Sequence, residues 1–435
     1  MQASIEKVSS LERRLNVSLP VHEIEAEVEN RLKRLARSMR MHGFRPGKVP
    51  FRLVEQTYGG QVRQEVLGDV LQKSFGEAVR QQNLRVAGFP RFEPRPGSEG
   101  SQQVEFSATF EVYPEVTVNE LSGVRIERPV VSVGEAEVDK TIEILRKQRV
   151  SFRETERDAR LGDSVTIDYR GTIDGQEFEG GSGADQNVVL GEAGLLADFQ
   201  RHVLGARPGE ARGFELTFPE DYHGKEVAGK TARFDVTVKR VAEPVLPEVD
   251  ADFARALGIA DGDIQRMRED VKGNLEREVR RRRDARVKDQ VMAALLENSS
   301  VELPKALIQM EIERMMAGMR RDLQARGLTT EQITMPPEPF EAEAKRRVAL
   351  GLIIAELVKR EKLAARPEQI KAMVQDYAQS YEKPEEVVRW YYQSADRIRE
   401  VESLVLETNV VEWVLSKAQV QDQPIAFDEL MESRK

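Results

Sequence analysis

Residues 162–180 read GDSVTIDYRGTIDGQEFEG, and this stretch decides the fold of the middle of the 435-residue chain. Val165, Ile167 and Tyr169 alternate with polar residues, which is the period of a β-strand with one buried face. The pair Asp174-Gly175 that follows is typical of a two-residue hairpin turn. The stretch therefore predicts two antiparallel strands with their apolar side chains on one face.

The same alternation returns in two more predicted strands further along the chain. Their inward-facing residues are Phe214, Leu216 and Phe218 in one and Phe234, Val236 and Val238 in the other. A short amphipathic stretch between the strands predicts a helix over the apolar face of the sheet. Its apolar residues are Leu195, Leu196, Phe199 and Val203. Residues 161–241 thus form an α+β module whose inward rings make either an ordinary core or the lining of an apolar pocket.

The N-terminal part predicts two helices joined by a rigid loop. Apolar residues three or four apart define a first helix of about twenty residues. They are Val21, Ile24, Val28, Leu32, Leu35 and Met39. The loop over residues 42–50 holds two glycines and two prolines, and Pro50 fits the first turn of the second helix. The apolar face of that second helix is formed by Val62, Val66, Val70 and Val79.

Positive charge gathers around this loop. The chain has a formal net charge of −9, yet residues 30–54 contain no acid and eight bases, Arg31, Lys33, Arg34, Arg37, Arg40, Arg45, Lys48 and Arg52. Most such runs are the solvated face of a helix. Here the ring of Phe44 has no core to enter, which favours a docking site. Lys and Arg bind phosphate without reading sequence and Arg45 can instead pair with a carboxylate, so a ribonucleoprotein surface fits both modes.

From Pro247 onward the chain predicts helices. One apolar face begins at Ile264 and continues to Asn298, a helix of roughly 36 residues or some 54 Å. Further helices are predicted to begin near Pro304, Glu338, Pro367 and Pro384, with Gly327 ending one of them. The basic run Arg280–Arg283 is a solvated helix face, because it is neutralised by Glu276, Glu278, Asp284 and Asp289.

Residues 254–339 contain no aromatic residue but hold seven of the twelve methionines, Met267, Met292, Met310, Met315, Met316, Met319 and Met335. Flexible thioether side chains suit a surface that must fit many apolar partners, because they repack where a ring cannot. Methionine as a gap filler between packed helices is an equally good interpretation. The rings that follow are predicted to lie in the core of the helical body; they are Tyr377, Tyr381, Trp390, Tyr391, Tyr392 and Trp413.

The composition excludes several classes of function. The chain has no cysteine, and its four histidines, His22, His42, His202 and His223, stand at least twenty residues apart. Disulfides, thiol chemistry and clustered metal ligands are therefore not expected. The first residues have no apolar signal core and no stretch approaches the roughly 20 apolar residues of a membrane span. We expect a cytoplasmic protein with no membrane contact, no metal and no cofactor, and no ATP use, since a phosphate-binding glycine loop is missing.

The loop pattern Gly43-Phe44-Arg45-x-Gly47-x-x-Pro50 resembles the ribosome-docking signature of the trigger factor family, bacterial chaperones at the ribosomal tunnel exit. Position 46, a lysine in some members, is Pro46 here, so one phosphate contact is lost. The resemblance implies contact with the large ribosomal subunit near the tunnel exit, through ribosomal protein and rRNA. The residues it implies for this contact are Gly43, Phe44, Arg45, Gly47, Lys48 and Pro50.

The middle module resembles the FKBP type of peptidyl-prolyl isomerase, which occupies this place in trigger factor. The resemblance lies in Gly162-Asp163, Gly171-x-x-x-Gly175, Phe178-Glu179-Gly180 and Phe218-Pro219-x-x-Tyr222. By position it implies a proline pocket lined by Tyr169, Phe178, Leu196, Phe199, Tyr222 and Phe234. Two departures bear on its activity: Ala197-Asp198 replaces a frequent Pro-Gly pair, and Glu179 replaces the aspartate of the single-domain isomerases.

A pocket of rings is sufficient for this chemistry. Rotation of an X-Pro bond meets a barrier of roughly 18 to 20 kcal/mol that comes from amide resonance. The twisted transition state has lost that resonance, and its carbonyl is less dipolar than in the planar form. An apolar, water-poor pocket therefore destabilises the planar state more than the twisted one.

The complete interpretation is a multidomain α+β protein. Its expected parts are an α+β ribosome-docking domain with a long helix-loop-helix (residues 1–113), a linker (114–150), an FKBP-like antiparallel sheet with a helix (151–245) and an all-α substrate-binding domain with projecting arms (246–435). The resemblance implies an ATP-independent chaperone that shields nascent chains, is also a peptidylprolyl cis-trans isomerase, and forms a weak homodimer when free. It further implies a link to cell division and the cell cycle, and client contact through Met310, Met315, Met316 and Met319.

Two other hypotheses remain open at this point. One is a stand-alone FKBP-type isomerase whose helical domain serves for dimerisation or targeting, although this leaves Phe44 without a role. The other is an RNA-binding protein that uses the basic loop. The acidity of the whole chain and the lack of interleaved rings within residues 30–54 count against it.

Overall fold

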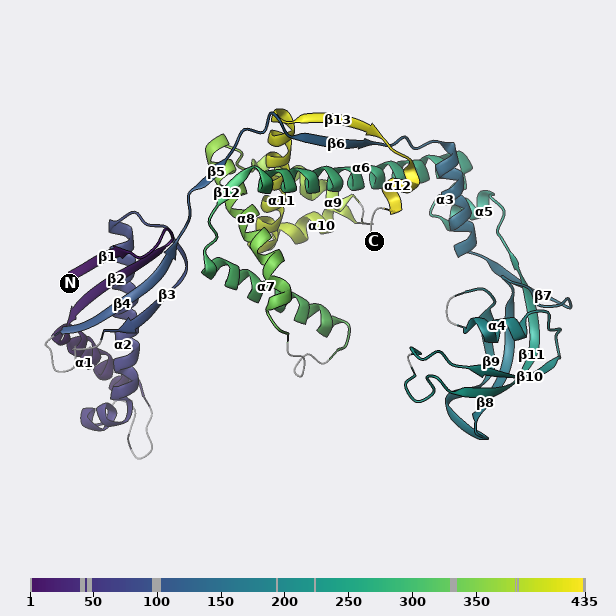
Figure 1. Cartoon of the computed structure of the whole chain (residues 1–435), viewed down its shortest axis with the longest axis horizontal. Coiled ribbons are helices and arrows are strands. Elements are labelled where there is room, and N and C mark those ends of the chain that lie inside the picture. Colours follow the sequence, from purple (N-terminus) through teal and green to yellow (C-terminus); the bar gives the residue numbers. More distant parts are fainter. Residues whose placement is uncertain are drawn as a thin grey trace. The chain divides into compact units, whose positions relative to one another are not determined.

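The computed structural model describes residues 2–39, 44, 49–95, 103–192, 195–222, 224–328, 335–379, 381 and 383–432 (Figure 1). The chain forms two units, each built from two stretches of sequence. The first consists of Met1–Arg128 with Ala285–Gln423, and the second of Pro129–Asp284 with Pro424–Lys435. Neither unit is continuous, so the chain crosses between them more than once.

The N-terminal part of the first unit is a four-stranded antiparallel sheet packed against two helices. The strands lie in the order β1-β2-β4-β3. The elements are β1 (Gln2–Lys7), β2 (Glu12–Pro20), α1 (Val21–Ser38), α2 (Phe51–Gln81), β3 (Val86–Pro94) and β4 (Gln103–Val112). Ile24, Val28 and Leu32 of α1 are buried against Val62 and Val66 of α2 and the sheet, which confirms the predicted apolar faces of both helices.

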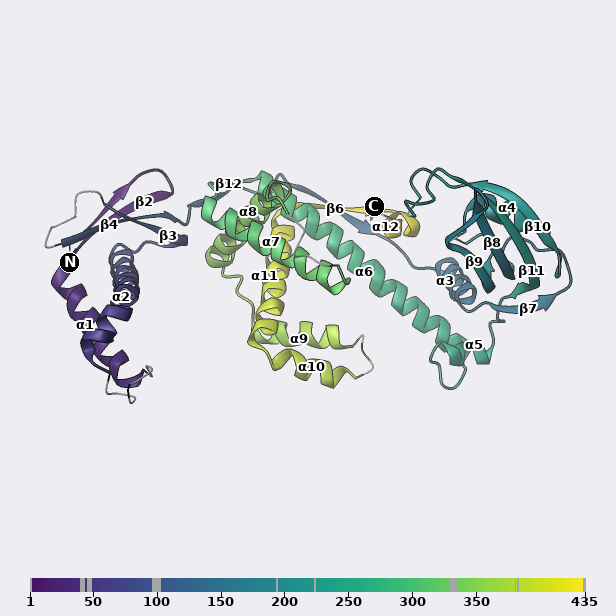
Figure 2. The same ribbon diagram turned by 90° about the horizontal axis from the view of Figure 1, so that it is seen from below.

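The rest of the first unit is largely helical. Its helices are α7 (Lys305–Ala325), α8 (Glu338–Glu361), α9 (Pro367–Ala378), α10 (Pro384–Tyr392) and α11 (Ala395–Lys417). The four predicted helix starts are confirmed to within a residue, because proline is tolerated at the start of a helix and not inside it. Figure 2 shows α9 and α10 side by side next to one end of α11.

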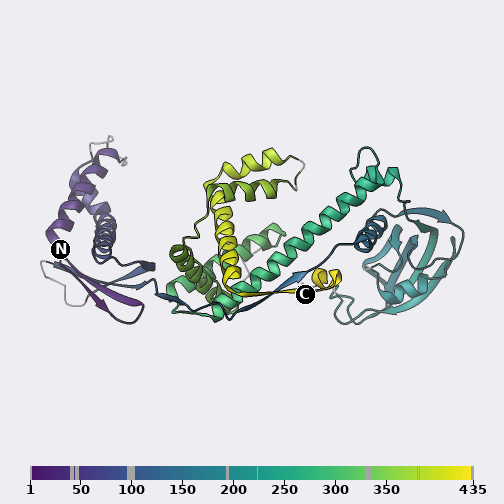
Figure 3. The same ribbon diagram turned by 90° about the horizontal axis from the view of Figure 1, so that it is seen from above.

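The longest helix is α6 (Ile264–Glu297), and Figure 3 shows it as one continuous rod. Its 34 residues agree with the length that the sequence predicted. Val287, Val291 and Leu295 in its last turns pack into the core of the helical body with α8 and α11. Met267 and Val271 near its start pack in the second unit, against α3 (Glu135–Gln148) and α5 (Ala251–Ala256).

The predicted linker segment is built into the fold. It contributes β5 (Val116–Val118), which pairs with β12 (Ser299–Val301), and β6 (Arg125–Val130), which pairs with β13 (Gln419–Pro424). Leu121 and Ile126 lie in the core of the helical body. The C-terminal part is therefore not purely helical as expected, since strands this short carry no readable alternation of their own.

The second unit contains a five-stranded antiparallel sheet in the order β10-β11-β8-β9, with β7 also paired to β11. Its elements are β7 (Ser151–Thr155), β8 (Ser164–Ile173), β9 (Gln176–Val189), α4 (Ala197–Val203), β10 (Ala211–Thr217) and β11 (Thr231–Val245). Asp174 and Gly175 both have positive φ, which confirms the predicted hairpin turn. The predicted helix is α4, and its Phe199 and Val203 are buried against the sheet. The last helix of the chain, α12 (Phe427–Glu432), also belongs to this unit.

Candidate active site

A cluster of aromatic rings fills the space between the sheet of the second unit and α4. Phe234, on the central strand β11, is in ring contact with five other rings at centroid distances of 5.5 to 6.5 Å: Tyr169, Phe178, Phe199, Phe214 and Phe218. Two of these pairs, with Phe178 and Phe199, meet edge to face, one of the arrangements that ring quadrupoles prefer. The cluster therefore has a centre, and that centre is Phe234.

Strand pairing explains why these rings converge. Phe214 of β10 lies opposite Phe234 of β11, and Tyr169 of β8 lies opposite Val236. Residues two apart on a strand share a face, so the inward positions of three neighbouring strands fall on one surface. The sheet also needs glycine beneath the rings. A Cβ at Gly171 would lie 2.6 Å from Cε1 of Phe234, and one at Gly183 would lie 2.8 Å from Cε1 of Tyr169.

The six residues predicted for the proline pocket come together in this one cluster. Phe199 and Phe234 are buried and form its floor. The other four are half-buried and pack around that floor: Tyr169, Phe178, Leu196 and Tyr222. These six side chains, two buried and four half-buried, are called the bowl below.

Three further residues belong to this cluster and were not predicted as site residues. Phe218 contacts both Phe178 and Tyr222, at centroid distances of 5.8 and 4.9 Å. Phe214 stacks on the imidazole of His202 at 4.3 Å. The alternation in β10 marked both phenylalanines as inward-facing but not as neighbours of the pocket. His202 could have been found from its spacing, since it lies three residues after Phe199 on the same helix.

The two departures from the isomerase pattern lie outside the ring cluster. Asp198 forms an ion pair with Arg201, 2.9 Å away, and both side chains are largely exposed. Glu179 is also exposed. Neither carboxylate therefore belongs to the apolar lining.

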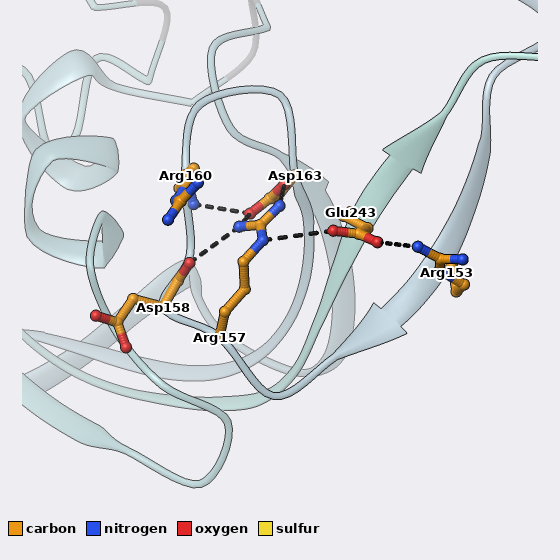
Figure 4. A network of polar contacts seen from close by, with 6 residues as sticks. All are labelled: Arg153, Arg157, Asp158, Arg160, Asp163 and Glu243. Carbon is orange, nitrogen blue, oxygen red and sulfur yellow. Dashed lines mark hydrogen bonds and ion pairs between the residues drawn. The ribbon is translucent and has the colours of Figure 1, made fainter.

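Next to the start of β8, a network of polar contacts fixes the segment that enters this strand (Figure 4). The Asp163 side chain is 1% exposed and accepts two hydrogen bonds from the guanidinium of Arg157, at 2.6 and 2.9 Å. It accepts a third from the backbone N–H of Arg160, at 2.8 Å. A buried carboxylate is tolerated only with such partners. Asp163, part of the Gly162-Asp163 pair, is thus a structural residue.

Glu243 extends this network to the neighbouring strands (Figure 4). It bonds Arg153 at 2.5 Å and lies 3.5 Å from Nε of Arg157. The hydrogen bond from Arg153, with the charges of both arginines, lowers the pKa of Glu243. The network therefore ties the loop before β8 to β7 and β11, and so supports the strands that carry the rings.

The loop that was predicted to dock, residues 42–50, is described only in part. Gly43, Arg45, Gly47 and Lys48 lie outside the described residues. Phe44 is 40% exposed, while Val49 is buried and Pro50 precedes the first turn of α2. Two bases of the run are paired with acids outside it, Arg31 with Asp69 and Lys33 with Glu29.

The methionines divide into two groups. Met267 and Met292 are buried and fill gaps in cores, whereas Met310 and Met319 on α7 are 44% and 46% exposed. The other two predicted contact residues on α7, Met315 and Met316, are half-buried. Ile312 is the one buried residue among the described positions of α7. The exposed thioethers of α7 thus remain available to a partner.

The prediction that the C-terminal rings lie in the core is wrong for four of the six. Tyr377, Tyr381, Trp390 and Tyr392 are between 39% and 60% exposed, and only Tyr391 and Trp413 are half-buried. The physical reason is that α9 and α10 are short and α10 has no buried residue at all. Trp390 is covered on one face by the guanidinium of Arg397, 3.7 Å from its ring centroid.

Across the described ranges, no helix is both long and apolar enough to span a membrane. In the same residues, no three His, Cys, Asp or Glu side chains gather as they would around a metal ion.

An antiparallel sheet with one short helix across an aromatic bowl defines the FKBP class of peptidyl-prolyl isomerases. The model of the FKBP-type peptidyl-prolyl cis-trans isomerase family matches residues 155–239. The models of bacterial trigger factor protein and of its C-terminus match residues 1–145 and 263–416. Both ends of the chain are thus accounted for by one further family.

Relatives of similar length agree with this assignment. The trigger factor of Nitrosospira multiformis is 55% identical over 432 residues, 99% of each chain, and that of Chromobacterium violaceum is 52% identical over 434 residues, 100% of each. A solved structure of a trigger factor chaperone is 18% identical over 96% of this chain and 100% of its own, with a TM-score of 0.47.

The chain belongs to the trigger factor family. It is a molecular chaperone with an FKBP-type peptidyl-prolyl isomerase module in its middle. The alternative of a stand-alone isomerase is not favoured, because the family matches extend to both sides of that module.

Proposed function

We propose that this chaperone docks on the large ribosomal subunit near the tunnel exit, through ribosomal protein and rRNA, and shields nascent chains there. The loop from Gly43 to Pro50 would make the contact. The single observation that supports this best is the exposed ring of Phe44, between α1 and α2, in a sequence of the trigger factor family. An exposed ring beside cations suits a surface that offers both phosphate and carboxylate.

The division of labour along the chain is part of the proposal. Residues 1–113 dock, residues 151–245 isomerise and residues 246–435 hold the client, with residues 114–150 connecting them. The coarse assignment follows the three family matches, while the boundaries themselves are proposals. A cytoplasmic location, a link to cell division and a weak homodimer in the free state are the remaining expectations from the family.

For isomerisation we propose that the ring cluster binds the prolyl side chain and the X-Pro amide. Phe199 and Phe234 would support the proline ring from below, and Tyr169, Phe178, Leu196 and Tyr222 would exclude water around it. No proton needs to move, because the barrier is amide resonance. The rings act by disfavouring the more dipolar planar amide.

For client binding we propose the exposed apolar side chains of the helical body. These are the exposed Met310 and Met319 on α7 and the exposed rings of α9 and α10, with the half-buried Met315 and Met316 of α7 beside them in the sequence. Met side chains adapt to different partners, and exposed rings add contact area at low entropic cost. A chaperone that must hold many sequences needs both properties.

Docking is tested by co-sedimentation with ribosomes. The double change Phe44→Ala and Arg45→Ala is expected to abolish co-sedimentation and leave isomerase activity intact. The matched control is Phe89→Ala, which removes a ring that is even more exposed than that of Phe44, 83% against 40%, from β3 outside the loop. Retained sedimentation of the loop variant, or equal loss in the control, contradicts the docking proposal.

The pocket is tested by catalysis of proline-limited refolding. Phe199→Tyr or Tyr222→Ala is expected to slow catalysis while ribosome binding persists. An unchanged rate in both variants would refute the assignment. Removal of residues 161–241 is expected to abolish isomerisation and keep most of the suppression of aggregation. If suppression is lost as well, the helical body is not the main client surface.

A further inference from the structure

The helix that carries Phe199 is fixed at its C-terminal end by one arginine. Nη1 of Arg212 donates to the carbonyl oxygens of His202 and Leu204, and Nη2 to that of Gly205, each at 2.8 Å. Nε of Arg212 bonds Glu210, also at 2.8 Å. The last carbonyls of a helix have no partner within it, so this side chain satisfies them. Together with the ring contacts of Phe199, it makes α4 a fixed element.

From this fixed helix, the side chain of Gln200 reaches back to the segment before it. Its Oε1 accepts a hydrogen bond from the backbone N–H of Gly191 at 2.9 Å. Its Nε2 donates to the carbonyl oxygens of Glu192, at 3.2 Å, and of Leu195, at 3.1 Å. One half-buried amide thus holds both ends of a backbone segment whose second end continues into Leu196 of the bowl. Residues 193–194 between them lie outside the described part.

We propose that Gln200 is a positioning residue for the isomerase, which sets the wall of the bowl formed by Leu195 and Leu196. The three hydrogen bonds of its side chain all go to backbone groups of the segment that leads to this wall, and none goes to a ring of the cluster. The inference rests on the assignment of the pocket given above. It adds a polar residue to a site that the ring pattern described as purely apolar.

The chemistry of the contact specifies an amide. Gln200 accepts one hydrogen bond and donates two, which only a side chain with both C=O and NH₂ can do. An ionised glutamate in the same place keeps the bond from Gly191 but cannot donate, and it sets a negative charge beside two carbonyl oxygens. Alanine loses all three contacts. We therefore expect glutamine at position 200 to support catalysis best, and both glutamate and alanine to support it less well.

The effect on catalysis follows from the position of the wall. When the wall is held, the bowl is ready for the prolyl ring; when it is not, only a fraction of molecules can bind. The apparent affinity falls by that fraction, while the bound complex reacts at its normal rate. Loss of Gln200 therefore raises KM and leaves kcat nearly unchanged.

The experiment uses the full chain and a proline-containing tetrapeptide. Gln200→Ala and Gln200→Glu are each expected to raise KM about three- to tenfold, with kcat within about twofold of the wild type. The matched control is Gln176→Glu, the same amide-to-carboxylate change on an exposed side chain beside the Asp174-Gly175 turn. It is expected to behave as the wild type in both constants.

A pH profile separates positioning from a merely structural role. A protonated carboxyl can donate one hydrogen bond, and glutamate has an ordinary pKa of about 4.3. The KM of Gln200→Glu is therefore expected to move toward the wild-type value as the pH falls from about 7 to about 4, whereas that of Gln200→Ala stays high. A parallel response of the two variants contradicts the proposal.

Other outcomes also decide the matter. A loss confined to kcat, a KM within about 1.5-fold of the wild type, or a loss shared by Gln176→Glu overturns the role of Gln200. If either variant melts at a much lower temperature, amide hydrogen exchange at Gly191 in Gln200→Ala, which removes the acceptor of the Gly191 N–H, replaces the kinetic test. Exchange as slow as in the wild type then overturns the proposal. If the wild type is inactive, or if Tyr222→Ala is fully active, the result refutes the pocket assignment on which the role of Gln200 rests.

Discussion

The rings of the isomerase module and the rings of α9 and α10 have opposite environments. In the module, Phe234 is 5% exposed and surrounded by other rings, whereas Trp390 and Tyr392 are about half exposed. The module closes a sheet against a helix, so inward positions meet neighbours on both sides. Among the residues that the structure describes, none covers the exposed rings of the two short helices in this way. Aromatic content alone thus says nothing about whether a ring stabilises the fold or is left for a partner.

The largest expected effect is at the centre of the buried rings. Phe234→Ala removes contacts to five rings and leaves a cavity, so the module should lose about 3–5 kcal/mol of stability. Isomerase activity should fall to background. Thermal unfolding and peptide isomerisation measure the two losses. A variant that keeps its stability would show that the rings of the module are no better packed than those of α10.

The next effect concerns the polar support of the module. Asp163→Asn keeps the shape of a buried side chain but removes the charge that the Arg157 guanidinium binds at 2.6 and 2.9 Å. The change leaves the partly buried guanidinium of Arg157 without its carboxylate partner, so the melting temperature of the module should fall by roughly 5 °C or more. Asp235→Asn, an exposed carboxylate on β11, is the control and should melt as the wild type does. Equal melting of both variants would contradict a supporting role for Asp163.

Removal of the exposed rings of α10 should cost little stability but weaken client binding. Trp390→Ala combined with Tyr392→Ala is expected to change stability by less than about 1 kcal/mol, mostly through the contact of Arg397 with Trp390. Suppression of aggregation of an unfolded client should weaken about threefold. Trp390→Phe with Tyr392→Phe keeps the rings and should retain suppression. A large loss of stability in the alanine variant would place these rings in the core after all.

The smallest effect is on the pH dependence of stability. The hydrogen bond from Arg153 lowers the pKa of Glu243, so its contribution is complete above the unfolded pKa of about 4.3 and is lost as the pH falls through the folded value. Burial raises the pKa of Tyr377, so its contribution is complete below about pH 10 and is lost as the pH rises further.

Glu243 lies on β11 of the isomerase module and Tyr377 on α9 of the helical body. The loss of stability in acid and the loss in alkali are therefore expected to depend on different parts of the molecule. Glu243→Gln should flatten the acid limb of the unfolding curve, and Tyr377→Phe the alkaline limb. Denaturant titrations at several pH values check both. If either substitution alters the opposite limb, the assignment of that limb is wrong.

The isomerase module was predicted well because the alternation of apolar and polar residues along a strand shows which of its faces is buried. Alternation in β8, β10 and β11 placed Phe214 and Phe234 correctly, and one turn pair located the hairpin. Proline marked the helix starts in the C-terminal part. Periodicity does not show whether another element covers the apolar face of a helix, because that depends on tertiary packing. The exposure of Trp390 could therefore not be predicted.

The polar contacts of the site were also beyond sequence reasoning. Gln200 is one of many glutamines, and nothing in its neighbours shows that its amide bonds three backbone groups before Leu196. Arg157 and Asp163 are six residues apart in a loop, a spacing without a regular period. Such contacts depend on the path of an irregular backbone, which local propensity does not determine.

The interleaved course of the chain has a consequence for its own synthesis. The isomerase module is one continuous stretch and has all its strands as soon as Val245 has left the ribosome. The helical body is not, because Leu121 and Ile126 share a core with Val410 and Val414, and Gln419 donates to the carbonyl oxygen of Ser122, 297 residues earlier. Leu121 and Ile126 therefore lack part of their core until translation is nearly finished. A chaperone of new chains is thus itself a new chain with a long vulnerable interval.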